Sequence, residues 1–288
     1  MKPIDVLLAI SVAMIWGGGF LFAKVAMDHF PPILLMAFRF GLAAVVLVWF
    51  VPRPDNSILK RLFWITLISA SIQYSLTFTG LKGLDASTAI IVVQLEVPFA
   101  VLCAWVFLKD RLELKHVIGI GLAFLGVLLI AGEPQLENNL ASMLMVVAGA
   151  ATWAVGQVMI KALGQVGGFV LIAWVAVLAS PQLLLSSLLF EDDHLGAIRN
   201  ADAVVWAAVV YLGLVMTALG YAIWYHLIGK YSVNQVMPFL LLLPVATVAG
   251  GVLLLDEVLT PRIAAGGVLA ITGVAIINLV KSAADRRT

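Results

Sequence analysis

Long apolar runs separated by short polar stretches make up almost the whole chain. A helix needs about 20 mainly apolar residues to cross a bilayer, and the sequence contains ten such runs. They are centred on residues 6–23, 33–51, 62–81, 86–108, 116–131, 140–160, 167–190, 203–227, 234–255 and 263–280. The pattern therefore predicts an all-α polytopic membrane protein of ten transmembrane helices, with connections too short to hold a soluble domain.

Composition supports this prediction and narrows the chemistry. Hydrophobic residues make up 63% of the 288 residues and charged residues 11%, whereas a soluble domain carries about 25% charged residues. The lone Cys103 rules out a disulfide within the chain, and the four histidines lack the spacing of metal ligands. A net charge of +1 leaves no basic patch for nucleic acid. We expect no metal, no cofactor and no nucleic-acid partner, and a monomer in the lipid bilayer.

The distribution of lysine and arginine predicts the orientation. Ten spans place both termini on one side, and with that side taken as the cytoplasm, twelve of the seventeen basic residues lie inside and four outside. The seventeenth, Arg39, lies within a span. This bias follows the positive-inside rule, so we expect both termini to be cytoplasmic, in the inner (plasma) membrane.

Several features of the first half recur in the second. The recurring features are Trp16 with Lys24 and Trp153 with Lys161, residues 98–112 and 244–259, and Gly119 with Gly126 and Gly266 with Gly273. These pairs predict two five-helix repeats, residues 1–135 and 136–288. Five is odd, so the second repeat enters the membrane from the opposite side. Inverted repeats of this kind occur in many secondary transporters, and we expect the two repeats to surround a central cavity.

The same motifs resemble the EamA-type branch of the drug/metabolite transporter superfamily, over roughly residues 5–280. The motifs that carry the resemblance are Trp16-Gly17 with Phe20 and Lys24, Pro32 with Arg39, Pro98 with "FLKDRL" (107–112), Gly119 with Gly126, and Trp153 with Lys161. The chain departs from the family's usual Leu-Gly-Glu-Arg at residues 108–111 and 255–258. The resemblance implies a ten-helix, basket-shaped carrier of small polar metabolites, most similar to the amino-acid exporters.

Glu96 is an acidic residue in the middle of the apolar run 92–108. An acidic group at the centre of a membrane helix costs roughly 2.5–3.5 kcal/mol and almost always faces the bundle interior or water. The equivalent position in the second half is Leu242 or Leu243, so the repeat itself does not require the charge. We interpret Glu96 as a site for a substrate ammonium or a coupling proton; the alternative is a protonated acid hydrogen-bonded to a neighbouring helix.

Two prolines at matching positions predict interrupted helices. Pro98 and Pro244 lack the N–H that would bond the carbonyl four residues earlier, and a freed carbonyl in hydrocarbon needs a partner in protein or water. We therefore expect both helices to face a cavity, although a plain packing kink is the alternative. The full set of candidate substrate-binding residues is Trp16, Tyr74, Gln94, Glu96, Pro98, Trp153, Gln157, Tyr221, Asn234, Gln235 and Pro244.

Arg39 lies about two turns from the outer end of its span. We interpret it as an architectural residue that reaches the interface or pairs with a carboxylate.

These features favour a secondary transporter that exports amino acids or similar small polar metabolites by alternating access. The chain has no G-x-x-x-x-G-K-[ST] loop for ATP. An intramembrane enzyme is the alternative from another class, but it would need clustered catalytic groups. Within transport, a multidrug or lipophilic-cation carrier and a sugar-nucleotide carrier remain open.

Overall fold

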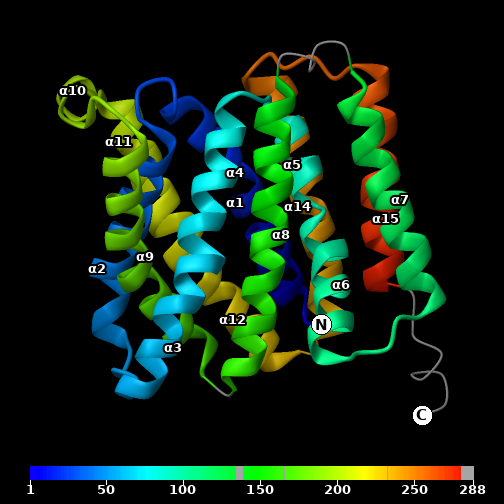
Figure 1. The fold of residues 1–288 in the computed structure, drawn as a ribbon, viewed down its shortest axis with the longest axis horizontal. Coiled ribbons are helices and arrows are strands. Elements are labelled where there is room, and N and C mark those ends of the chain that lie inside the picture. Colours follow the sequence, from blue (N-terminus) through cyan, green and yellow to red (C-terminus); the bar gives the residue numbers. More distant parts are fainter. Residues whose placement is uncertain (134–138, 165, 232, 280–288) are drawn as a thin grey trace.

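The computed structural model is a bundle of long helical spans, each of which runs antiparallel to the next along the chain (Figure 1). It describes residues 1–133, 139–164, 166–231 and 233–279. Within these residues, ten stretches of helix are long and apolar enough to cross a membrane, as the hydrophobic pattern predicts. The expected boundary between the repeats, at residues 135 and 136, lies outside the described residues.

The first half contributes five of these spans. Their elements are α1 (Pro3–Ala26), α2 (Pro32–Leu47) with η1 (Val48–Phe50), α3 (Asn56–Thr66) with η2 (Leu67–Ile72) and α4 (Gln73–Lys82), α5 (Ala86–Val93) with α6 (Glu96–Leu108), and α7 (Leu114–Ala131). Helices α1 and α2 have a proline in their first turn, where its missing N–H costs nothing.

The second half repeats this order. Its elements are α8 (Leu140–Leu163), α9 (Gly168–Phe190), the short α10 (His194–Asn200), α11 (Ala203–Val210) with η4 (Tyr211–Leu219) and α12 (Gly220–Lys230), α13 (Val233–Val236) with η5 (Met237–Leu241) and α14 (Leu242–Leu254), and α15 (Pro261–Leu279).

Irregular backbone falls at equivalent places in the two halves. The π-helical segments η2 and η4 interrupt the third span of each half. The α-helix of the fourth span of each half is interrupted just before its proline. As a result, α6 begins at Glu96 and α14 at Leu242, each two residues ahead of Pro98 or Pro244. This confirms the predicted interruptions and identifies Leu242 as the counterpart of Glu96.

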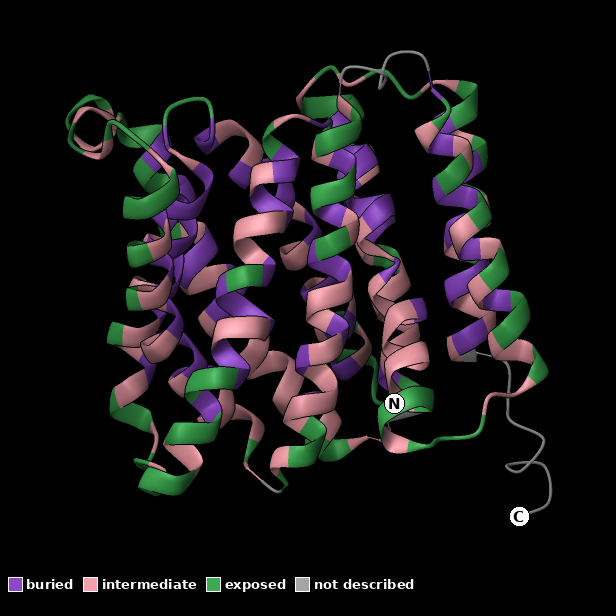
Figure 2. Cartoon of the chain, in the orientation of Figure 1, coloured by how far each residue is buried: buried purple, intermediate pink, exposed green. Residues whose placement is uncertain are grey.

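Packing follows the same pseudo-two-fold relation. Helix α1 packs on the third and fourth spans of the second half, as α8 packs on those of the first. Helix α2 lies against α9, and α7 against α15, so each of these helices contacts its own counterpart. Buried residues concentrate along these contacts, and exposed ones cover the outer faces and the ends (Figure 2).

The α7–α15 contact depends on glycine. A methyl group on Gly119 would lie 2.6 Å from the carbonyl oxygen of Gly273, and one on Gly266 would lie 2.6 Å from that of Gly126. Only glycine lets the two backbones approach this closely. Since the same two positions of each half meet in reversed order, the helices run antiparallel, as inverted repeats require.

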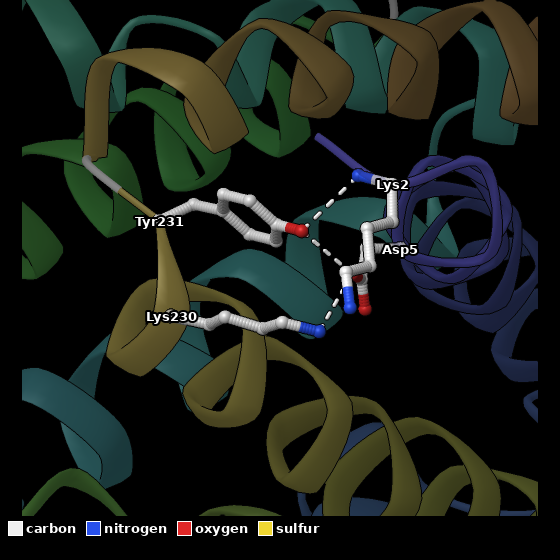
Figure 3. Close-up of polar contacts among 4 residues, drawn as sticks. All are labelled: Lys2, Asp5, Lys230 and Tyr231. Atoms are coloured by element: carbon white, nitrogen blue, oxygen red, sulfur yellow. Dashed lines mark hydrogen bonds and ion pairs between the residues drawn. The ribbon is translucent and has the colours of Figure 1, made fainter.

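One polar cluster joins the ends of α1 and α12 (Figure 3). The Asp5 carboxylate accepts hydrogen bonds from Lys230 Nζ and from the Tyr231 hydroxyl, both at 2.7 Å. That hydroxyl in turn accepts the backbone N–H of Lys2 at 3.1 Å. The cluster fixes α1 to the third span of the second half at the end of the bundle where α1 begins and α15 ends, here called the termini end.

Candidate functional site

A cavity of about 230 Å³ lies where the halves cross. Sites for drug-sized ligands have roughly 300–1,000 Å³, so this volume suits a smaller molecule. The residues that line it are Trp16, Phe20, Arg39, Gln73, Tyr74, Thr77, Phe78, Ile90, Val93, Gln94, Glu96, Val97, Trp153, Met216, Tyr221, Met237, Leu240, Leu241, Leu243, Val274 and Asn278.

The interrupted spans supply the middle of the wall. Gln94 lies in the break between α5 and α6, and Glu96 occupies the first turn of α6. In the second half, Leu240 and Leu241 at the end of η5 take the matching place. The cavity is therefore polar on the α6 side and apolar on the η5 side, although the backbones correspond.

Glu96 has no hydrogen-bond or ion-pair partner among the described residues. Glu96 lines the cavity, where a bound molecule or water can supply a partner. Among the described residues, no hydrogen bond joins Glu96 to a neighbouring helix, which was the alternative expected from sequence.

Aromatic rings form much of the remaining wall. Trp16 packs on Tyr221 with ring centroids 5.0 Å apart and on Trp224 at 5.7 Å. Its indole N–H donates to the carbonyl of Met216 at 3.1 Å, which fixes the ring on η4. Trp153 lines the cavity from α8. Both repeat-related tryptophans thus meet the same cavity.

Arg39 is the residue that the sequence interpretation misplaced. Its side chain is 1% exposed, and so does not reach the interface. Its Nε donates to Thr217 Oγ1 at 3.0 Å, and no carboxylate of a described residue lies within 4.0 Å of it. The signal that could have revealed this was its depth: two turns inside the span was too far for the side chain to return to water once neighbouring helices covered it.

The other candidates are distributed between the cavity and its surroundings. Six of the eleven line it: Trp16, Tyr74, Gln94, Glu96, Trp153 and Tyr221. Four do not, namely Pro98, Gln157, Gln235 and Pro244; both prolines are buried, and Gln235 is exposed. The side chain of Asn234 lies outside the described residues. Gln73 and Arg39 are lining residues that the candidate set omitted.

The cavity extends toward the termini end. Met237 and Asn278, which lie near that end of their spans, line it. At the opposite end it stops beneath Phe20 and Phe78, which are buried and stack with centroids 5.8 Å apart.

Polar contacts of Glu257 and Lys24 lie at the same end of the bundle as Phe20 and Phe78. Glu257, in the loop after α14, accepts the backbone N–H groups of Ala86 at 2.6 Å and Ser87 at 3.0 Å, and so caps the N-terminus of α5. Lys24 Nζ donates to the carbonyls of Leu81, Lys82 and Leu84 at the end of α4 (2.6–3.2 Å). We call Glu257 and Lys24 the latch.

The counterparts of the latch residues at the termini end are arranged differently. The loops after α6 and α14 have the same backbone: Lys109 and Asp256 have positive φ, and the N–H groups of Asp110 and Glu257 bond the carbonyls of Ala104 and Gly251. Within the described part of the chain, the Asp110 carboxylate accepts no backbone N–H from a helix start; it forms an exposed ion pair with Lys161 at 3.2 Å. Equivalent residues thus cap a helix at one end of the bundle and form an exposed ion pair at the other.

Comparison with known proteins identifies the family. The profile described as the EamA-like transporter family matches residues 4–132 and again residues 140–279. The chain belongs to this family. It is therefore a multi-pass membrane transporter, which decides against the enzyme alternative.

Relatives in the EamA-like transporter family span nearly the whole chain. A "Probable amino-acid metabolite efflux pump" of Salmonella typhimurium is 35% identical over 96% of this chain and 95% of its own. A protein of Escherichia coli with the same description is 31% identical over the same shares. A solved crystal structure with 20% identity superimposes with a TM-score of 0.66 over 96% of each chain, which supports the fold alone.

Proposed function

We propose that this transporter exports amino acids or similar small polar metabolites from the cytoplasm by alternating access. The observation that carries the proposal is the cavity beside the two interrupted spans, which extends toward the termini end and has the latch contacts at the other end. Transporters with inverted repeats bind their substrates at such a midplane site.

The size and chemistry of the cavity support an amino-acid-sized substrate. Aromatic rings offer a surface for an apolar side chain, while Arg39, Gln73, Gln94 and Glu96 supply polar and charged contacts. The relatives described as amino-acid metabolite efflux pumps agree with this substrate class, as does a "Probable terminal-alkyne amino-acid exporter" of Streptantibioticus cattleyicolor, 27% identical over 91% of this chain.

The bias of basic residues supports a cytoplasmic termini end in the inner membrane. In that orientation the latch lies at the outer end, and we propose that the structure represents a state accessible from the cytoplasm. The two repeats are proposed to divide at residues 135 and 136.

Alternating access is supported by the unequal use of equivalent residues. In the state open to the outside, the latch would release, and Asp110 with Lys161 would take the closing role at the cytoplasmic end. Because the backbones of the two loops already match, the exchange needs a change of partners rather than of fold.

Within the cavity, Glu96 is proposed to bind the ammonium group of the substrate or a coupling proton. Trp16, Trp153, Tyr74 and Tyr221 are proposed to enclose the apolar part.

Flux measurements on purified protein test the proposal. Proteoliposomes are loaded with radiolabelled amino acids, sugar nucleotides or lipophilic cations, and efflux is followed with and without a pH gradient. Efflux of amino acids above that of protein-free liposomes is expected. Transport confined to sugar nucleotides or lipophilic cations would refute the substrate class, and absence of any substrate-dependent flux would refute the transport proposal.

A further inference from the structure

Arg39 places a positive charge in the wall of the cavity. It projects from α2, is 1% exposed to the surface, and borders the cavity together with Gln73 and Tyr74 of α4. An arginine side chain remains charged inside proteins, and buried charges are normally paired with an opposite charge. Arg39 should therefore have an acidic partner, either in the protein or in a bound molecule.

The protein itself only partly satisfies the guanidinium group. Nε donates to Thr217 Oγ1 at 3.0 Å, Nη2 reaches the Tyr74 hydroxyl at 3.5 Å, and Nη1 has the thioether of Met36 at 3.8 Å. The group also lies over the ring of Tyr74, 4.8 Å from its centroid. All of these partners are neutral. An arginine has five N–H donors, so donors remain for an acceptor in the cavity.

Gln73 adds a second unsatisfied polar group to the same wall. It is 4% exposed; its Nε2 donates to Thr77 Oγ1 at 3.1 Å, while its Oε1 is buried without a partner. Buried polar atoms without partners are rare in folded proteins. Two residues that line the same cavity therefore have unused hydrogen-bonding capacity that points to a polar ligand.

We infer that Arg39 binds the carboxylate of the transported molecule, and that Gln73 hydrogen-bonds the same polar end. This inference rests on the proposed function and specifies it: the cavity takes a carboxylic acid rather than the corresponding amide or amine. A planar guanidinium matches a carboxylate through two parallel N–H···O bonds. Glu96, on the separate wall formed by α6, remains for a positively charged group or a proton.

A purely structural role for Arg39 makes a different prediction. Its contacts join α2 to η4 and α4, and a residue that only joins helices would affect all ligands alike. A carboxylate site instead discriminates between ligands that differ only in that group.

The first test uses the wild-type protein. Thermal stabilisation in detergent is measured for each of the twenty L-amino acids and, for those that bind, for the matching carboxamide and decarboxylated amine; a ligand that binds the folded state raises the melting temperature. We expect the acid to bind about 10- to 100-fold more tightly than the amide, the range for a charge-assisted hydrogen bond. Equal binding of acid and amide overturns the inference and leaves amino-acid transport intact.

Two variants assign the discrimination to this residue. Arg39→Gln should bind acid and amide equally, and Arg39→Lys, which keeps the charge without the planar fork, should retain part of the preference. Arg53→Gln, at an exposed arginine outside the cavity, should leave the preference unchanged. A full preference in Arg39→Gln overturns the inference. If Arg39→Gln does not fold, the comparison of acid with amide in the wild type and in Arg39→Lys tests the inference. A full preference for the acid in Arg39→Lys would contradict binding through the planar guanidinium.

Failure of the substrate proposal is distinguishable from failure of this inference. If no amino acid binds or is transported, phenylacetate is compared with phenylacetamide on the wild type and on Arg39→Lys. Stabilisation by phenylacetate alone, reduced in the variant, supports a carboxylate site in a carrier of other acids. Equal responses to the two compounds overturn it.

Discussion

Replacing the latch glutamate with glutamine should open the cavity to the outside. Glu257→Gln keeps one carbonyl oxygen that can accept an N–H from Ala86 or Ser87 but removes the negative charge from the N-terminus of α5. Loss of a charge at a helix N-terminus costs about 0.3–2 kcal/mol, and loss of one charged hydrogen bond costs a further 1.5–3 kcal/mol at most. A total of about 1.8–5 kcal/mol shifts the balance between access states roughly 20- to 5,000-fold.

Cysteine accessibility measures this shift. In a Cys103→Ser background, Val93→Cys introduces a thiol in the cavity wall. A membrane-impermeant maleimide is added from outside, and its rate of reaction reports the fraction of molecules that are open to the outside. The rate should rise in the Glu257→Gln protein by a factor within the range given above.

Glu191 provides a matched control at the same end of the bundle. Its carboxylate caps α2 with the same chemistry, accepting the N–H groups of Ile33 at 2.8 Å and Leu34 at 3.0 Å. It joins α9 to α2, however, which pack along their lengths and do not form the latch. Glu191→Gln should lower the melting temperature without changing the labelling rate. Equal labelling of Glu257→Gln and wild type, with both folded, would refute the latch.

Further predictions concern the cavity, the latched end of the bundle and the orientation in the membrane. Glu96→Gln should weaken binding of a zwitterion by about 1–3 kcal/mol if the carboxylate binds an ammonium, or abolish the pH dependence of flux if it carries a proton; liposome flux at two pH values separates these, and no change in either rejects both roles. Trp153→Ala should weaken substrate binding about 2- to 10-fold, equivalent to 0.5–1.5 kcal/mol for one aromatic contact, while the protein still folds; unfolding of this variant with a silent Trp153→Phe would contradict a cavity role. Asp85 immediately precedes α5; burial and the nearby Glu257 raise the pKa of its carboxyl group, although Lys24 lowers it. Ionised Asp85 therefore destabilises the state in which the latch is formed. This penalty grows as the pH rises through the raised pKa. Asp85→Asn should therefore slow labelling from outside at pH 7 and have little effect well below pH 4. A cysteine at Asn200 should react only from outside and one at Ser57 only from inside; the reverse pattern would reject the orientation.

Much of the fold follows from the sequence because the bilayer imposes a simple rule. Any run of about 20 apolar residues can cross it, and residues 86–108 were predicted to do so with the limits that the structure has. The interruption near Glu96 was also predictable, since a proline removes a specific hydrogen bond wherever it lies. Repeated residues such as Gly119 and Gly266 then implied the relation between the halves.

The site was less predictable because it depends on which neighbours cover each side chain. Arg39 could have reached the interface, paired with a carboxylate or lined a cavity, and only the packing of α2 against η4 and α4 separates these outcomes. Gln157 and Trp153 lie on the same helix, yet only Trp153 lines the cavity. The latch was not predicted at all, because the sequence near Glu257 resembles that near Asp110 while their partners differ.

The α7–α15 contact has a consequence for the origin of the chain. Each helix presents the same pair of glycines to the other, so the contact is isologous, like the interface of a symmetric dimer. A single five-helix protein that inserted in both orientations would have met its own copy along this surface. Gene duplication and fusion would then have preserved a contact that already existed, while the inner walls became free to diverge. Glu96 is charged while its counterpart Leu242 is apolar, a difference that a dimer of two identical chains cannot have.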